Sequence, residues 1–244
     1  MNRVLLGEKH KELAIGLSNL AFVLQEKGDL PRAEATFRQA LAMQRELFGN
    51  AHPDVAMTLN NLAYVYSAQH DIKDELSAQR ESLAIYQQLF PGDHPDVARV
   101  ANQLGFFLTE AGQYAEAERY VRDSLEMRRR LLGNTHPDVG SSLTSLAILQ
   151  VATRKYAAAL DSAREAVKIY TAAFSATHWR TAIPASAEGA ALAGLGRYAE
   201  AEKVLPPAYQ ILTHDIGVSK TYATLAQRYL DDLHRREGLV AQDH

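Results

Sequence analysis

The sequence His52-Pro53-Asp54-Val55-Ala56 returns 42 residues later as His94-Pro95-Asp96-Val97-Ala98, and again as His136-Pro137-Asp138-Val139-Gly140. Weaker versions lie on the same 42-residue grid, at residues 10–14 (HKELA) and 178–182 (HWRTA). Self-similarity at a period of roughly 20 to 50 residues is typical of solenoids, in which each supersecondary unit packs on its neighbours. This repeat therefore decides the fold class.

Each repeat has the pattern of a helical hairpin. In residues 53–90, Val55, Leu59, Leu62 and Tyr66 recur at spacings of three and four, which predicts an amphipathic first helix starting at the proline. A break follows at residues 69–71, and the matching breaks at 27–29, 111–113 and 195–197 contain glycine, which ends a helix cheaply. A second apolar periodicity then runs to Phe90 and predicts the second helix of the hairpin.

Small residues mark the point where the two helices of each hairpin should cross. A larger side chain there would hold the axes further apart than ordinary helix packing allows. Glu75 breaks the pattern, which predicts either a local shift of its helix or a carboxylate whose stem leads outward to water. The small residues are Ala21, Ala63, Gly105, Ala147 and Gly189 in the first helices, and Ala33, Ala117, Ala159 and Ala201 twelve positions later in the second helices.

These patterns resemble the tetratricopeptide repeat, in the 42-residue variety of kinesin light chains and many bacterial proteins. The matching lines are HPDVAMTLNNLAYVYSAQHDIKDELSAQRESLAIYQQLF (52–90) and HPDVARVANQLGFFLTEAGQYAEAERYVRDSLEMRRRLL (94–132), and the likeness covers about residues 10–212. The resemblance implies an all-α, right-handed superhelical solenoid of antiparallel helix pairs. It also implies a protein–protein interaction scaffold that binds a peptide segment in its concave groove.

The grid divides the chain into four parts. Residues 1–7 align with residues 43–49 and are expected to end a truncated repeat helix, and residues 8–218 form about five repeats. Pro184, Pro206 and Pro207 fall inside the helices of the last repeat, which is therefore predicted to be kinked or shortened. Residues 219–236 are predicted to form a capping helix and residues 237–244 a tail.

The composition argues against several classes of function. A net charge of −3 offers no basic surplus for nucleic acid, and the absence of cysteine removes thiol nucleophiles and cysteine zinc sites. No segment approaches the ~18 to 20 apolar residues of a membrane span, so we expect a cytoplasmic protein. The motifs of common enzymes are missing, which predicts no catalysis and no cofactor. We interpret the repeated His-Pro-Asp as helix capping rather than a metal site.

The resemblance places ligand contacts on the inward side chains of the first helices. Asparagine there could hold a peptide backbone, since it both donates and accepts hydrogen bonds, and aromatic residues would add apolar contact. Alternatively, Asn61 and the aromatic residues pack between neighbouring helices. Arg99 could pair with a ligand carboxylate, although Glu26 and Glu110 would repel it. The predicted groove comprises Ser18, Phe22, Asn60, Tyr64, Arg99, Asn102, Phe106 and Thr144, with Ser186 at the same register.

Two further features lie outside the groove. The run Arg128-Arg129-Arg130 is predicted to form a solvated outer face rather than a nucleic-acid patch. The opening helix is expected to be truncated, and its exposed N-terminal edge lacks a cap, so the chain could self-associate through this edge. The last repeat also weakly resembles arrays that follow bacterial serine/threonine kinase domains. The alternative function is therefore a regulatory or oligomerisation module of a larger signalling protein.

Overall fold

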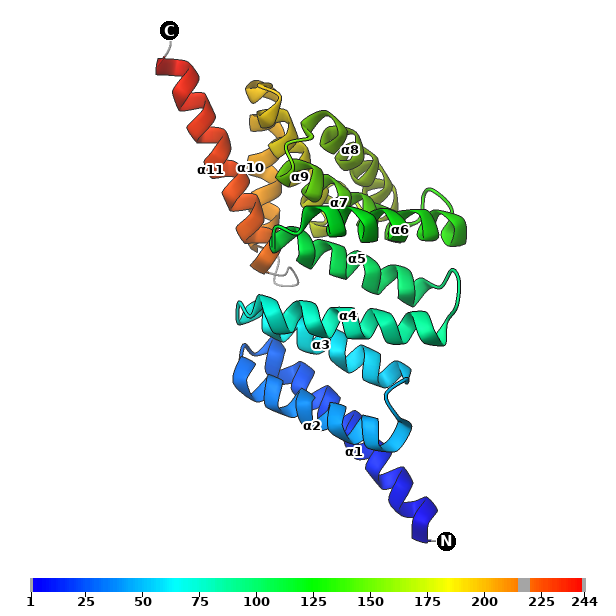
Figure 1. Ribbon diagram of the computed structural model, residues 1–244. Helices are drawn as coiled ribbons and strands as arrows, with labels where there is room; N and C mark the ends of the chain where they lie inside the picture. Colours follow the sequence, from blue (N-terminus) through cyan, green and yellow to red (C-terminus); the bar gives the residue numbers. More distant parts are fainter. Residues whose placement is uncertain (1, 215–219, 243–244) are drawn as a thin grey trace. The chain divides into compact units, whose positions relative to one another are not determined.

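The computed structural model describes residues 2–214 and 220–242, which form eleven helices and no strand (Figure 1). The all-α prediction is confirmed, and the hairpins from α3 onward begin where the repeat predicts. The helices are α1 (Asn2–Glu26), α2 (Leu30–Phe48), α3 (Pro53–Ala68), α4 (Ile72–Leu89), α5 (Pro95–Glu110), α6 (Tyr114–Leu132), α7 (Pro137–Ala152), α8 (Tyr156–Ala173), α9 (Trp179–Gly194), α10 (Tyr198–His214) and α11 (Lys220–Gln242).

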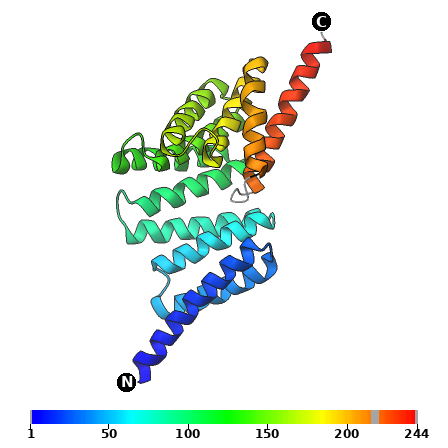
Figure 2. The same ribbon diagram turned by 180° about the vertical axis from the view of Figure 1, so that it is seen from behind.

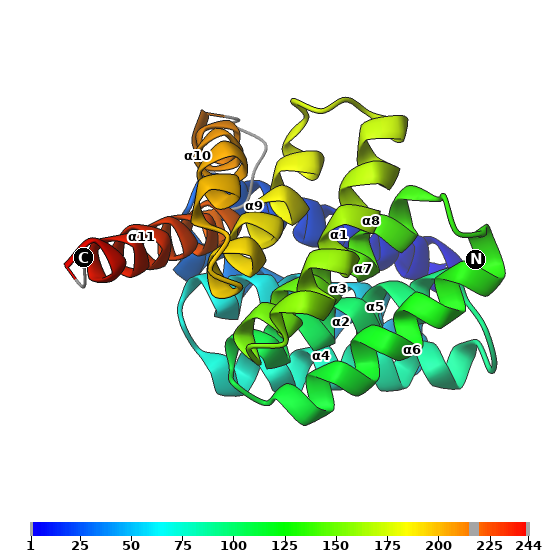
Figure 3. The ribbon, with the colours of Figure 1, turned by 90° about the horizontal axis from the view of Figure 1, so that it is seen from above.

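The chain forms two compact units, residues 1–111 and residues 112–244. In the first unit α1 packs on α2 and α3 on α4, and α3 and α5 each pack on the second helix of the preceding hairpin. Helices α2 and α4 lie on one face of this unit, in front of α1 and α3 in Figure 1. In the second unit α7 packs on α8 and α9 on α10, and α11 covers α9 and α10 (Figure 3).

The repeated histidine caps the first helix of its hairpin. In His52, His94 and His136 the ring Nδ1 accepts a hydrogen bond of 3.1 to 3.2 Å from the backbone N–H two residues later. The next residue is proline at the first helical position, where its missing N–H costs nothing. His178 caps α9 in the same way, and its ring and those of His52 and His94 also stack on the phenylalanine at the end of the preceding helix. The stacked pairs are Phe48–His52, Phe90–His94 and Phe174–His178. The capping interpretation is confirmed, with the imidazole as the capping acceptor.

The small residues do lie where the helices cross. Ala63, Ala147 and Ala201 are fully buried. A Cβ atom added to Gly189 would come within 2.6 Å of the Leu205 Cβ on the partner helix, a separation that real Cβ atoms do not reach. The close approach of the two helices therefore depends on the small side chain.

The expected ends of the array differ from the structure in three places. Residues 2–26 form one continuous helix instead of a helix that ends at residue 7. Pro184 does not shorten α9, which has the same 16 residues as α3, α5 and α7. Helix α11 extends to Gln242, past the predicted end at residue 236. Residues 215–219, at the predicted junction, and residues 243 and 244 lie outside the described residues.

Two charged residues are buried, Glu75, for which an outward stem was one of two alternatives, and Arg128, which was predicted to be solvated. Glu75 is only 5% exposed, so its stem does not carry the carboxylate outward. Burial raises the pKa of Glu75 to about 7, against the opposing hydrogen bond from Ser67. Arg128 is also buried, and its Nη1 donates to the Asp138 carbonyl (2.7 Å) and to the Ser142 hydroxyl (2.9 Å). The basic run is therefore not a uniform solvated face.

Candidate peptide-binding face

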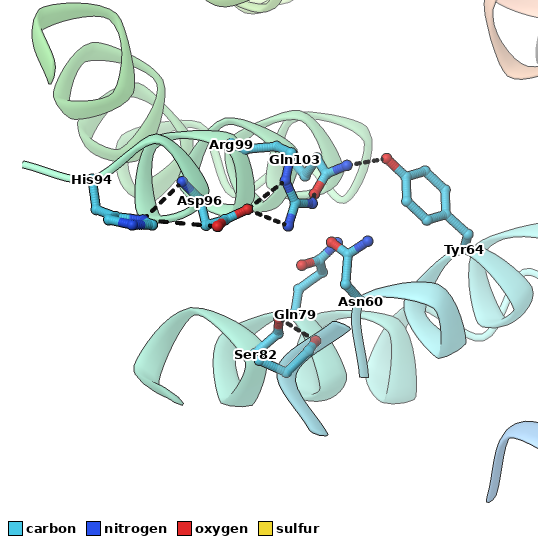
Figure 4. Close-up of polar contacts among 9 residues, drawn as sticks. Asn60, Tyr64, Gln79, Ser82, His94, Asp96, Arg99 and Gln103 are labelled. Atoms are coloured by element: carbon cyan, nitrogen blue, oxygen red, sulfur yellow. Dashed lines mark hydrogen bonds and ion pairs between the residues drawn. The ribbon is translucent and has the colours of Figure 1, made fainter. Parts of the chain in front are cut away.

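Asparagine 60 and asparagine 102, the central residues of the predicted groove, are buried. Asn60 is 5% and Asn102 7% exposed. Asn60 Oδ1 accepts a hydrogen bond of 3.3 Å from Gln79 Nε2, inside the α3–α4 hairpin (Figure 4). The prediction that these amides face an open groove is wrong, because both are buried and Asn60 points toward the second helix of its own hairpin.

The hydroxyl groups predicted at the same register are also used within the fold. Ser18 Oγ donates to the Ala14 carbonyl (3.2 Å) and accepts from Gln44 Nε2 (3.2 Å) in the first unit. In the second unit Thr144 is buried, and its hydroxyl donates to the Gly140 carbonyl of its own helix (2.8 Å). Ser186 is buried in the same way and donates to the Ile183 carbonyl (2.7 Å).

The amides that do reach the surface lie one residue further along. Asn19, Asn61 and Gln103 are spaced by 42 residues on α1, α3 and α5, and all three are exposed or half-buried. We call these three residues the amide row. Sequence reasoning missed Asn19 and Gln103 and assigned Asn61 to packing, although their 42-residue spacing was a signal that could have found them.

Aromatic and apolar side chains flank the amide row. Tyr64 and Phe22 follow it by three residues on α3 and α1, and both are exposed as predicted, whereas Phe106 is buried. Met57, four residues before Asn61, is exposed as well. Residues at i, i+4 and i+7 share one side of a helix. The row and its flanking side chains therefore form one surface of the first unit, which we call the peptide face.

A chain of polar contacts joins α3 to α5 on this face (Figure 4). Gln103 Nε2 donates to Tyr64 Oη at 2.5 Å, and Gln103 Oε1 accepts from Arg99 Nη1 at 3.3 Å. Arg99 in turn contacts Asp96 Oδ1 at 3.2 Å. Since the tyrosine oxygen accepts in this arrangement, its own O–H remains able to donate to another group.

Arg99 is thus already paired, contrary to the prediction that it awaits a ligand carboxylate. Its guanidinium lies between Asp96 and Gln103 and above the Tyr86 ring, with 5.8 Å from Cζ to the ring centroid. A ligand carboxylate would have to displace Asp96 from the half-exposed guanidinium group of Arg99. The peptide face therefore offers neutral hydrogen-bonding groups more readily than a free positive charge.

The first unit has one further hollow, on the side of the second helices. A space of about 360 Å³ lies between α2 and α4 with α3 at its floor. Ion pairs join its two walls, at 2.5 Å between Arg45 and Glu81 and at 3.9 Å between Arg38 and Asp74. Because these charges neutralise one another, the hollow offers no unbalanced charge to a ligand.

The described part of the chain contains neither a membrane-spanning helix nor a cluster of side chains suited to bind a metal ion. None of its helices combines the length and the apolar character that a bilayer span needs. Within the same residues, no three histidine or carboxylate side chains come together as a metal site would require.

Comparison with known proteins identifies the family. The sequence model of the tetratricopeptide repeat matches residues 12–88 and 96–172. The chain belongs to the tetratricopeptide repeat (TPR) family. Members of this family are protein–protein interaction scaffolds. No curated protein sequence matches the chain significantly.

Solved TPR structures share the fold at low sequence identity. BtubC (BKLC) from P. vanneervenii is 22% identical with a TM-score of 0.69, over 87% of this chain and 89% of that one. The TPR-like repeats of a Podosopora anserina protein described as a kinesin light chain are 20% identical, with a TM-score of 0.68 over 80% and 92% of the two chains. A Rap protein complexed with Competence and Sporulation Factor is 13% identical, with a TM-score of 0.67 over 93% and 63%.

Proposed function

We propose that this TPR chain is a non-enzymatic, cytoplasmic scaffold that binds an extended peptide segment of a partner protein across its peptide face. The observation that carries the proposal is the amide row, which repeats an exposed or half-buried amide on three successive first helices. An amide donates and accepts together, so a row of amides can pair with successive peptide groups regardless of the peptide's side chains.

The surroundings of the row support a neutral peptide ligand. Tyr64 has an O–H that can donate to a peptide carbonyl, and Met57 and Phe22 add exposed apolar surface beside it. Arg99 is engaged by Asp96, so the binding energy should depend little on charge. We expect dissociation constants in the micromolar range, because a bound segment must give up its conformational freedom.

Two of the similar structures provide a precedent for peptide ligands. The Rap protein was solved with Competence and Sporulation Factor bound, and YrrB is described as a TPR protein with an unusual peptide-binding site. YrrB is 18% identical to this chain with a TM-score of 0.50. At these identities the likeness concerns the fold, so the ligand of this chain has to be found experimentally.

A displayed library of random peptides tests the proposal. Selection on the whole chain should yield peptides whose affinity falls at least tenfold in Asn61→Ala/Gln103→Ala, because two hydrogen bonds of about 1 kcal/mol each are lost. Tyr64→Phe should cost about fivefold to tenfold for the same reason. Gln87→Ala/Gln88→Ala, which removes two exposed amides of α4, serves as the control. Peptides that bind the Asn61/Gln103 variant and the control equally well would refute the assignment.

A further inference from the structure

Helix α1 leaves exposed a surface that is buried at the same register on α3, α5 and α7. The surface consists of Leu13, Gly16, Leu20 and Val23, which we call the N-terminal stripe. Its three large side chains are 51%, 49% and 47% exposed. At the same register on α3, α5 and α7 the residues are between 0% and 4% exposed, and they are Val55, Thr58, Leu62 and Val65; Val97, Val100, Leu104 and Phe107; and Val139, Ser142, Leu146 and Leu149.

The later repeats show what kind of group covers this register. Val139 and Leu146 of α7 belong to one buried cluster with Val121 and Leu125 of α6, the second helix of the preceding repeat. The natural partner of the N-terminal stripe is therefore an amphipathic helix with apolar side chains at a spacing of four.

The residues just before the stripe do not supply that helix. Residues 2–9 continue α1 without a break, so this stretch leads away along the helix axis instead of folding back over Leu13 and Leu20. Figures 1 and 2 show the N-terminal part of α1 extending past the end of α2. The covering helix has to come from another part of the sequence or from another molecule.

The stripe is complementary to itself. When two copies of α1 cross in antiparallel orientation about residue 18, Leu20 of each copy meets Gly16 of the other, and Leu13 meets Val23. A Cβ atom built on Gly16 has open space around it, so the glycine forms a notch that can receive the leucine. We propose that a second copy of this chain packs on the N-terminal stripe, with α1 against α1 about a two-fold axis.

The other end of the chain favours this closed arrangement over a head-to-tail filament. Helix α11 already covers the last hairpin, where Leu233 is fully buried in a cluster with Leu192 and Leu205. Leu225 and Ala226 are buried as well. A head-to-tail contact would need a bare second helix at this end, whereas a two-fold contact uses only the stripe. The short contact predicts a weak dimer with a micromolar dissociation constant.

Sedimentation velocity tests the proposal, over protein concentrations from about 1 to 200 µM to bracket micromolar dissociation constants. The whole chain should shift from monomer to dimer, and Leu20→Glu should weaken association at least 100-fold, because each dimer would bury two unpaired carboxylates. Ile15→Glu, a similarly exposed position on another side of α1, should dimerise normally. A chain that stays monomeric throughout, or equal losses in both variants, would overturn the proposal.

Two more variants separate dimerisation from misfolding and fix the orientation. Gly16→Leu fills the notch and should abolish the dimer, while helix content rises or stays constant since leucine favours the helix. The chain contains no cysteine. An equal mixture of Leu13→Cys and Val23→Cys chains should therefore form a disulfide-linked heterodimer, whereas neither variant alone should crosslink efficiently. Homodimeric crosslinking of the separate variants would contradict the antiparallel register.

Discussion

The carboxyl group of Glu75 should make the stability of the first unit depend on pH. Glu75 occupies the position at which α2, α6, α8 and α10 place a fully buried alanine. Its carboxyl receives a hydrogen bond from Ser67, and the nearby carboxylates of Glu110 and Asp71 add like charge. The informative change is Glu75→Gln, which keeps the shape of the side chain and removes its ionisation.

The structure fixes both the sign and the size of the effect. The pKa of Glu75 rises from 4.5 to about 7 on folding. Between these two values the folded chain retains a proton that the unfolded chain has lost, so stability falls as the pH rises. Each pH unit in this window costs about 1.4 kcal/mol. The loss of unfolding free energy between about pH 5 and pH 8 should therefore reach roughly 2 to 3 kcal/mol.

Urea unfolding followed by far-UV circular dichroism measures this loss. The wild-type chain and Glu75→Gln should be similarly stable near pH 5, and the variant should be more stable by roughly 2 to 3 kcal/mol near pH 8. Other titrating groups affect both proteins equally, so the difference between them isolates Glu75. Glu81→Gln, on the exposed side of the same helix, should show no such divergence. Parallel pH profiles for wild type and Glu75→Gln would refute the reasoning.

Two further predictions concern packing in the second unit. Arg128→Ala should lower the unfolding free energy by about 2 to 4 kcal/mol, since it leaves a cavity and two acceptors without their donor. The control Arg130→Ala, on the exposed side of the same helix, should change the unfolding free energy by less than about 0.5 kcal/mol. Equal effects of the two variants would show that Arg128 is not held as described. Gly189→Ala should lower the unfolding free energy by about 1 to 3 kcal/mol through the clash with Leu205. In a helix interior this change usually increases stability, so a gain in stability would contradict the close crossing of the two helices.

The repeat made most of the fold predictable, because one period supplied the helix positions five times over. Agreement between copies located the caps and crossings, which depend on local residue types such as the His52 ring and Gly189. The bounds of the opening helix were harder to predict from the sequence. His10 is followed by lysine instead of proline and lies inside α1, and nothing in residues 10–14 alone shows whether a helix starts there or runs through.

The candidate site was missed by one residue, for a geometric reason. Adjacent positions on a helix differ by about 100° in direction, and the pair Asn60-Asn61 offers an amide in both directions. Periodicity alone does not indicate which of the two asparagines faces the hairpin interior. In the structure it is Asn60, because Gln79 of α4 provides a polar partner for it inside the hairpin. The burial of Arg128 was easier to predict, because two of the residues at the same register, Tyr86 and Tyr170, are aromatic. Both are buried, as is Gln44 at the same register.

Two departures from the repeat's own pattern lie in the α3–α4 hairpin, next to the peptide face. Gln79 and Glu75 stand where other copies have apolar residues such as Phe37 and alanine, and both are buried. Gln79 Oε1 has no hydrogen-bond donor among the described residues, and a buried orphan acceptor costs about 1 to 3 kcal/mol. Both departures therefore reduce what this hairpin gains from its own interface. Helix α3 carries Asn61 and Tyr64, which we propose contact the ligand. The loss of packing stability therefore affects the proposed binding helix itself, as expected where function competes with packing.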